Sequence, residues 1–110
     1  MPYTYFYDCL ALNEAVPSDN PLPTTLAKVK AMLAEVLIDE GDFIGIVDEE
    51  GTTLQLLKQH AGIWMEVPDP AAEGSHGKVV TLDEARATLD QLGVTIEHYL
   101  IDGLVFEKWS

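Results

Sequence analysis

Histidine, serine and cysteine side chains are the groups in this sequence that could act as nucleophiles, general bases or metal ligands. Ser75 and His76 combine a nucleophile with a general base, but two adjacent residues form neither a nucleophile elbow nor a catalytic triad. The three histidines, His60, His76 and His98, are far apart in the sequence, and no two of them are spaced i, i+4. The sequence also contains only one cysteine, so the spacing of these residues does not match a zinc site. We therefore interpret His76 as a solvated residue in a loop and His98 as a strand residue with a local partner.

Carboxylates are far more numerous, and several of them surround one apolar segment within IDEGDFIGIVDEEGTTLQL, residues 38–56. They are Asp39, Glu40, Asp42, Asp48, Glu49 and Glu50. Their spacing does not follow the calcium-loop pattern, which needs oxygen ligands at alternate positions, a central glycine and a distal glutamate. The glycines of this segment do not form a phosphate-binding loop that leads into a helix. The sequence therefore predicts no metal site, no cofactor and no catalytic residue.

Part of this charge has a structural explanation. Residues 48–51 have the length of a four-residue hairpin loop between predicted strands at 43–47 and 52–57, and charged turns are common. The carboxylates within residues 39–42 follow the end of a predicted helix, where they face the negative end of the helix dipole. Residues 31–57 contain seven carboxylates and no Lys or Arg. We therefore predict an acidic patch that no basic residue compensates.

Net charge narrows the possible partners. The formal charge is −13, from 19 Asp and Glu against six Lys and Arg, and it would repel the phosphates of nucleic acids and anionic membranes. A basic protein would be attracted, although solubility alone explains the charge equally well. No apolar run reaches about 18 residues, and the start lacks a signal-peptide pattern. The lone Cys9, interpreted as a core residue, suits a reducing compartment. We therefore expect a cytoplasmic protein.

The periodicity of apolar residues predicts a single α+β domain over residues 1–110. We expect a mainly antiparallel sheet of about five to six strands, built as a meander and a C-terminal hairpin, packed with two α-helices. The predicted strands include 3–12, 43–47, 52–57, 63–67, 94–101 and 104–109, with a short strand at 78–80. Residues 14–23 are predicted as a loop, and residues 68–77 as the most mobile loop, which crosses one edge of the sheet.

Local signals place the ends of the helices. Thr24 or Thr25 can cap a first helix at about 25–38, which presents one apolar face. Thr81 to Glu84 fits a capping box and starts the second helix at Leu82. Gly93 stands where a left-handed residue usually ends a helix.

Three aromatic residues are candidate anchors for a partner. Trp64 fits a strand face, while Trp109 at the C-terminus either joins the core or covers a groove or contact. With Tyr99, these residues could anchor a partner if they are exposed, because buried aromatic side chains often dominate binding energy. The predicted partner-binding set therefore consists of the six carboxylates around residues 39–50 and these aromatic residues.

The order of the predicted elements resembles a known family. A helix is followed by FIGIVDEEGTTLQLL, by GIWMEVPDP, by a glycine-containing loop with SHGKVV, and by TLDEARATLDQLG. This order resembles the small acidic immunity proteins that bacteria make against their own polymorphic or contact-delivered toxins, over about residues 26–93. The resemblance implies a protein without enzymatic activity that binds a cognate toxin domain and occludes its active site. Many such toxins act on nucleic acids and carry basic clefts, which an acidic patch would complement.

Two other functions are compatible with the sequence. A small-molecule-binding or enzymatic domain would need a pocket between helix and sheet, with convergent polar groups such as His98 or Glu66. A structural module would self-assemble through an exposed strand edge or the final hairpin. The sequence does not indicate the oligomeric state.

Overall fold

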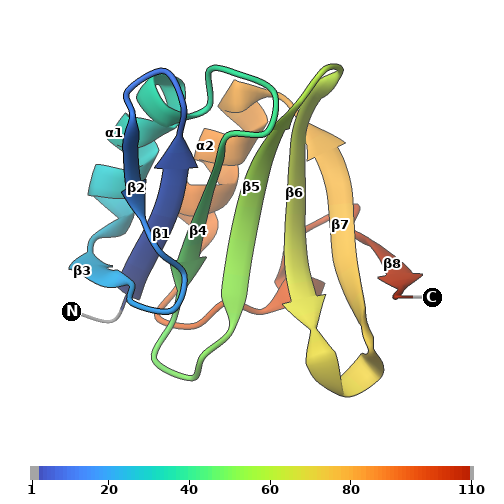
Figure 1. Cartoon of the computed structure of the whole chain (residues 1–110). Helices are drawn as coiled ribbons and strands as arrows, with labels where there is room; N and C mark the ends of the chain where they lie inside the picture. Colours follow the sequence, from blue (N-terminus) through green and yellow to red (C-terminus); the bar gives the residue numbers. More distant parts are fainter. Residues whose placement is uncertain (1–2, 110) are drawn as a thin grey trace.

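A single antiparallel sheet organises the chain, and both α-helices pack on one of its faces (Figure 1). The structure is a computed structural model that describes residues 3–109. Within these residues the sheet has eight strands in the order β2-β1-β4-β5-β6-β7-β8, with β3 also paired to β1. The predicted α+β class with two helices is confirmed, but the sheet has more strands than the predicted five to six.

The elements follow one another along the chain with short connections. The strands are β1 (Tyr3–Cys9), β2 (Glu14–Val16), β3 (Leu22–Thr24), β4 (Phe43–Val47), β5 (Thr53–Gln59), β6 (Gly62–Asp69), β7 (Gly74–Val80) and β8 (Val105–Lys108). The α-helices are α1 (Leu26–Val36) and α2 (Leu82–Gln91), and the single-turn 3₁₀ helices are η1 (Pro70–Ala72) and η2 (His98–Leu100). No helix within residues 3–109 has the length and apolar character needed to cross a membrane.

The alternation of side chains along the central strands separates two faces of the sheet. Ile44, Leu56 and Met65 are register partners on the helix-covered face, and all three are buried in the core. On the opposite face, which we call the open face, register joins Phe43 to Leu57, Leu57 to Trp64, and Trp64 to Val79. This arrangement confirms the predicted meander and places a row of apolar side chains across four neighbouring strands of the open face.

Local capping explains where the helices begin. The Thr25 side chain accepts a hydrogen bond from the backbone N–H of Lys28, and the predicted capping box between Thr81 and Glu84 is present in both directions. The predicted role of Gly93 is wrong, because α2 ends at Gln91, its C-cap Leu92 is extended, and Gly93 has no positive φ. The end of α2 needs no left-handed residue, since the chain continues directly into an extended segment.

The N-terminal part of the sheet accounts for the extra strands. The predicted loop at residues 14–23 contains β2, which pairs with β1 at Tyr7 to Cys9, and the next strand, β3, pairs with β1 at Tyr3 to Tyr5. Each is three residues long. Proline is tolerated in such edge strands because one side of the strand makes no ladder hydrogen bonds, so the prolines of this segment did not prevent pairing.

The predicted strand at residues 94–101, and with it the predicted C-terminal hairpin, is wrong. This segment crosses the end of the sheet on its helix-covered side, contains η2, and buries Ile96 and Ile101 in the core. Gly103 does adopt a positive φ of 80°, but the strand that follows it, β8, pairs with β7. The alternating pattern of residues 94–101 corresponds to two buried side chains in an irregular segment. This segment does not pair as a strand, because β8 already occupies the edge of β7.

The predicted mobile loop at residues 68–77 is also wrong. β6 continues to Asp69 and β7 begins at Gly74, so η1 closes a long hairpin between two adjacent strands. Glu73 takes the left-handed conformation at this turn, with φ 56°. His76 therefore lies inside a paired strand, where its position is fixed by the sheet.

Candidate functional site

The predicted acidic patch is divided between the two ends of β4. Asp39 and Glu40 are exposed in the connection that enters the strand, while Glu49 and Glu50 are exposed in the turn that leaves it. β4 is five residues long, which corresponds to roughly 17 Å. The four exposed carboxylates therefore form two acidic groups, one beyond each end of β4.

Asp42 organises the connection between α1 and β4. Its side chain is 4% exposed, and its carboxylate accepts hydrogen bonds from the backbone N–H groups of Leu10 (3.1 Å), Ile38 (3.2 Å) and Asp39 (2.7 Å). Burial favours a higher pKa, but these three backbone donors together hold the pKa of Asp42 below its ordinary value. Asp42 thus has a structural role after the helix, which explains a carboxylate at that position without any partner.

Acid should remove the contribution of the Asp42 carboxylate to the stability of the fold. Because the folded-state pKa of Asp42 is lowered, its carboxylate stabilises the fold above its unfolded-state pKa, and the stabilisation is lost as pH falls through the folded-state pKa. We expect Asp42→Asn to lower the free energy of unfolding by about 1–3 kcal/mol at neutral pH, with the difference from wild type shrinking below about pH 5. Urea unfolding from pH 7 to pH 3 measures both effects, and Glu40→Gln, an exposed neighbour, serves as the control. A constant difference at every pH would contradict the assignment.

Asp48 is the second buried carboxylate of the set. It is 5% exposed, and its Oδ1 accepts from the N–H groups of Glu50 and Thr52 at 2.9 Å each. Its Oδ2 accepts from the N–H of Ile96 at 2.7 Å. Asp48 therefore closes the β4–β5 turn and fastens the 94–101 segment to it, while Gly51 in this turn has a positive φ of 86°.

A chain of hydrogen bonds links two tryptophans on the open face at β6 and β7. Trp64 donates from Nε1 to Glu66, Ser75 donates from Oγ to Glu66 at 3.3 Å, and Trp109 donates from Nε1 to Ser75 at 3.1 Å. Trp109 is 49% exposed, so it lies over Ser75 and outside the core. A continuous chain of hydrogen bonds thus fixes both indole rings on the surface of the sheet.

Glycine allows the Trp64 ring to lie flat. A Cβ atom on Gly77 would come within 2.5 Å of Trp64 Cζ2, so only a glycine leaves room for the ring across the neighbouring strand. The same relation joins Phe6 and Gly45 nearer the other edge. Such aromatic–glycine pairs are a recognised way to cover glycines in sheets, and here they cover Gly45 and Gly77 on the open face.

Tyr99 is separated from the tryptophans by the sheet. It lies in η2 and makes an edge contact with His98, whose ring stacks on His76. His76 alternates with Ser75 along β7 and so points to the helix-covered side. The three predicted anchors therefore do not share one surface: Trp64 and Trp109 lie together, and Tyr99 lies elsewhere with 70% of its surface exposed.

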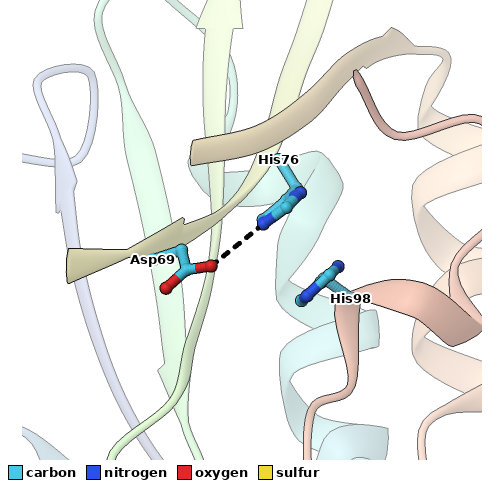
Figure 2. A group of neighbouring side chains, drawn as sticks. All are labelled: Asp69, His76 and His98. Carbon is cyan, nitrogen blue, oxygen red and sulfur yellow. Dashed lines mark hydrogen bonds and ion pairs between the residues drawn. The ribbon is translucent and has the colours of Figure 1, made fainter. Parts of the chain in front are cut away.

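A side-chain cluster that the sequence did not predict forms at the end of β6 and β7. Asp69, His76 and His98 bring one potential ligand atom each to within 4.8 Å of one another, and all three side chains are partly buried (Figure 2). His76 Nε2 lies 3.2 Å from Asp69 Oδ2, and the two imidazole rings stack with centroids 3.7 Å apart. The hydrogen bond with His76 is the main cause that lowers the pKa of Asp69, against the opposing effect of burial.

Sequence reasoning could not find this cluster. His76 and His98 do lie on different elements, as predicted, but the irregular 94–101 segment folds back and places η2 against β7. The predicted roles of a solvated loop residue and a strand residue are both wrong. The pairing of Asp69 with Gly74 at the end of the β6–β7 hairpin brings Asp69 close to His76, and no local sequence pattern marks this pairing.

Strand geometry places the side chains of Ser75 and His76 on opposite faces of the sheet. Ser75 faces the open side, where its Oγ contacts Glu66 and Trp109, whereas His76 contacts Asp69 on the other side. The predicted polar groups of a ligand pocket, His98 and Glu66, are separated in the same way. Neither pair converges on a common point.

A cavity of about 330 Å³ opens beside the histidine cluster. It lies between the β4–β5 turn, the end of the β6–β7 hairpin and the start of η2. Glu50, Asp69, Glu97 and His98 contribute to its walls. Three carboxylates on one cavity favour a positively charged occupant.

Comparisons with protein families, with curated proteins and with solved structures found no match to this chain.

Proposed function

We propose that this chain is a non-enzymatic binding protein that captures a basic protein domain on its open face. From the resemblance to bacterial immunity proteins, we infer that the partner is a cognate toxin domain, whose active site the bound protein occludes. The observation that carries the proposal is the apolar row of the open face, which includes Trp64, with Trp109 held near it by the hydrogen-bond chain. Within residues 3–109, no helix covers this face (Figure 1).

The open face has the composition of an interface centre. Aromatic anchors surrounded by apolar neighbours supply most of the binding energy in protein complexes. Phe43, Leu57 and Val79 are such neighbours of Trp64 through direct strand register. Because hydrogen bonds already hold the tryptophan rings, little side-chain freedom would be lost on binding.

Charge complements this apolar centre. A typical interface covers about 800 Å² on each partner, roughly 28 Å across, so it would extend past both ends of β4. The exposed carboxylates Asp39 and Glu40 at one end, and Glu49 and Glu50 at the other, then lie at its rim. Rim charges accelerate the encounter of complementary partners more than they tighten the final complex. This arrangement supports a basic partner whose association is accelerated by charge and whose complex is stabilised by apolar contacts.

An affinity experiment with matched baits tests the proposal. Three immobilised proteins are exposed at low salt to lysate from their own source: wild type, Trp64→Ala/Trp109→Ala, and Glu40→Lys/Glu49→Lys/Glu50→Lys. We expect wild type to retain one basic protein in stoichiometric amount, both variants to lose it, and equimolar wild type to inhibit its activity. Retention by all three baits, retention by none, or an active protein in the complex would refute the proposal.

Salt should act on the rate of association. We expect the association rate constant for that basic protein to fall about tenfold or more between roughly 0.05 and 0.5 M salt, since exposed charges are screened, while the dissociation rate changes little. Stopped-flow or surface-based kinetics measure both rates. Asp19→Lys, a charge reversal in the exposed β2–β3 connection, should leave the salt dependence almost unchanged. An association rate constant that does not change with salt would contradict electrostatic steering.

A further inference from the structure

We propose that Asp69, His76 and His98 form a binding site for one divalent transition-metal ion, for which zinc has the best-matched chemistry. The site lies on the helix-covered side of the sheet, away from the tryptophans of the open face, and the inference does not rest on the proposed function. Three elements supply one ligand each: the end of β6, the middle of β7 and the start of η2.

The donor atoms suit zinc in number and kind. Two imidazole nitrogens and one carboxylate oxygen are the set found in open zinc sites, which keep a fourth position for water or a bound ligand. Nitrogen donors disfavour calcium and magnesium, which prefer oxygen ligands throughout. The cavity beside Asp69 and His98 offers space for the fourth ligand, and the carboxylates of Glu50 and Glu97 on its wall raise the local concentration of cations.

Distances show how far the site is already formed. Ligand atoms around a tetrahedral zinc ion stand about 3.3 Å apart, given metal–ligand distances near 2.0–2.1 Å. The 3.2 Å separation between His76 Nε2 and Asp69 Oδ2 matches this value. The longest separation in the cluster is within 4.8 Å, so His98 must approach the other two ligands.

Stacking defines the movement that metal binding requires. The rings of His76 and His98 are parallel to within 7°, so their in-plane lone pairs do not point at one common ion. Turning the His98 ring brings a nitrogen toward the ion, and within residues 3–109 this ring makes no side-chain hydrogen bond that the turn would break. Metal binding therefore exchanges one ring stack for a coordinate bond.

The surrounding structure holds the other two ligands in place. Asp69 accepts from the N–H of Ala72 through Oδ1, at 3.3 Å, which directs Oδ2 toward His76. His76 is paired with Val67 in the sheet and its ring contacts Phe106. Outer contacts of this kind orient metal ligands and support affinity.

Zinc titration of the purified full-length protein tests the proposal, after treatment with chelator. We expect one equivalent of Zn²⁺ to bind, and His76→Asn or His98→Asn to weaken binding by more than the roughly 10- to 100-fold that loss of an outer contact costs. His60→Asn removes the exposed third histidine and should bind as wild type does. A wild-type dissociation constant weaker than about 1 mM, or equal losses in His60→Asn and His98→Asn, would overturn the site.

A second measurement does not depend on how the variants fold. Side-chain nitrogen NMR of the wild-type protein during the same titration should shift the imidazole signals of His76 and His98 together, saturating at one equivalent, with His60 unchanged. Shifts confined to His60, or shifts that grow without saturation, would indicate surface binding only and would contradict the proposal.

Discussion

Replacing Asp48 with alanine is expected to lower the free energy of unfolding by about 3–5 kcal/mol. The Asp48 carboxylate accepts three backbone hydrogen bonds, two within the β4–β5 turn and one from Ile96. Hydrogen bonds to a charged group contribute more than neutral ones, and alanine would leave the buried N–H of Ile96 without this acceptor. Thermal or urea unfolding measures the loss, which for a domain of this size corresponds to a fall in Tm of roughly 10–20 °C.

Two variants make this result specific. Glu49→Ala changes the adjacent exposed carboxylate and should alter stability by less than about 0.5 kcal/mol. Asp48→Asn keeps one oxygen acceptor and should lie between wild type and Asp48→Ala. A loss below about 1 kcal/mol in the alanine variant would mean that water replaces the carboxylate.

Hydrogen exchange adds a local measurement to the same prediction. Because Asp48 ties the 94–101 segment to the turn, its removal should accelerate amide exchange at Ile96 more than in the core of the sheet. If exchange at Ile96 matched that of wild type, Asp48 would not be the anchor of this segment. Since His98 lies on the same segment, Asp48→Ala should also weaken zinc binding at the proposed site.

Replacing Trp64 or Trp109 with alanine is expected to reduce affinity for the proposed basic partner by about 100-fold, because central tryptophans at interfaces contribute on the order of 2–4 kcal/mol. The two rings share one hydrogen-bond chain through Glu66 and Ser75, so the double variant should lose less than the product of the single losses. Titration calorimetry with the protein retained in the affinity experiment measures each loss.

Tyr99→Ala is the matched control for the tryptophan variants. Tyr99 is the more exposed aromatic residue, at 70%, but it lies on η2 on the far side of the sheet. Its replacement should leave partner affinity within about twofold of wild type. A strong effect of Tyr99→Ala together with weak effects of the tryptophan variants would move the interface to the helix-covered side.

The sequence by itself determined the elements that depend on neighbouring residues. Thr25 and the Thr81 capping box mark the helix starts because a cap is completed within four residues. The β4–β5–β6 meander follows from alternating apolar residues separated by short turns. The acidic character and the unpaired, buried Cys9 were likewise readable without a structure.

Only the tertiary structure decided which distant residues meet. The short edge strands β2 and β3 exist because β1 offers them a partner, and the 94–101 segment is irregular because β8 takes the edge of β7. The apolar pattern of a sequence indicates which segments can form strands, but it does not show which strand edge remains available for pairing.

The candidate sites depend on the same long-range decisions. Asp42 and Asp48 look like members of one acidic patch in the sequence, yet folding buries both under backbone donors, including donors from Leu10 and Ile96. His76 and His98 are 22 positions apart in the printed sequence and come into contact only when the chain closes over the end of the sheet. Charge and local periodicity are properties of neighbouring residues, whereas the burial of charged side chains and ligand geometry are properties of contacts between distant ones, so the former could be predicted and the latter could not.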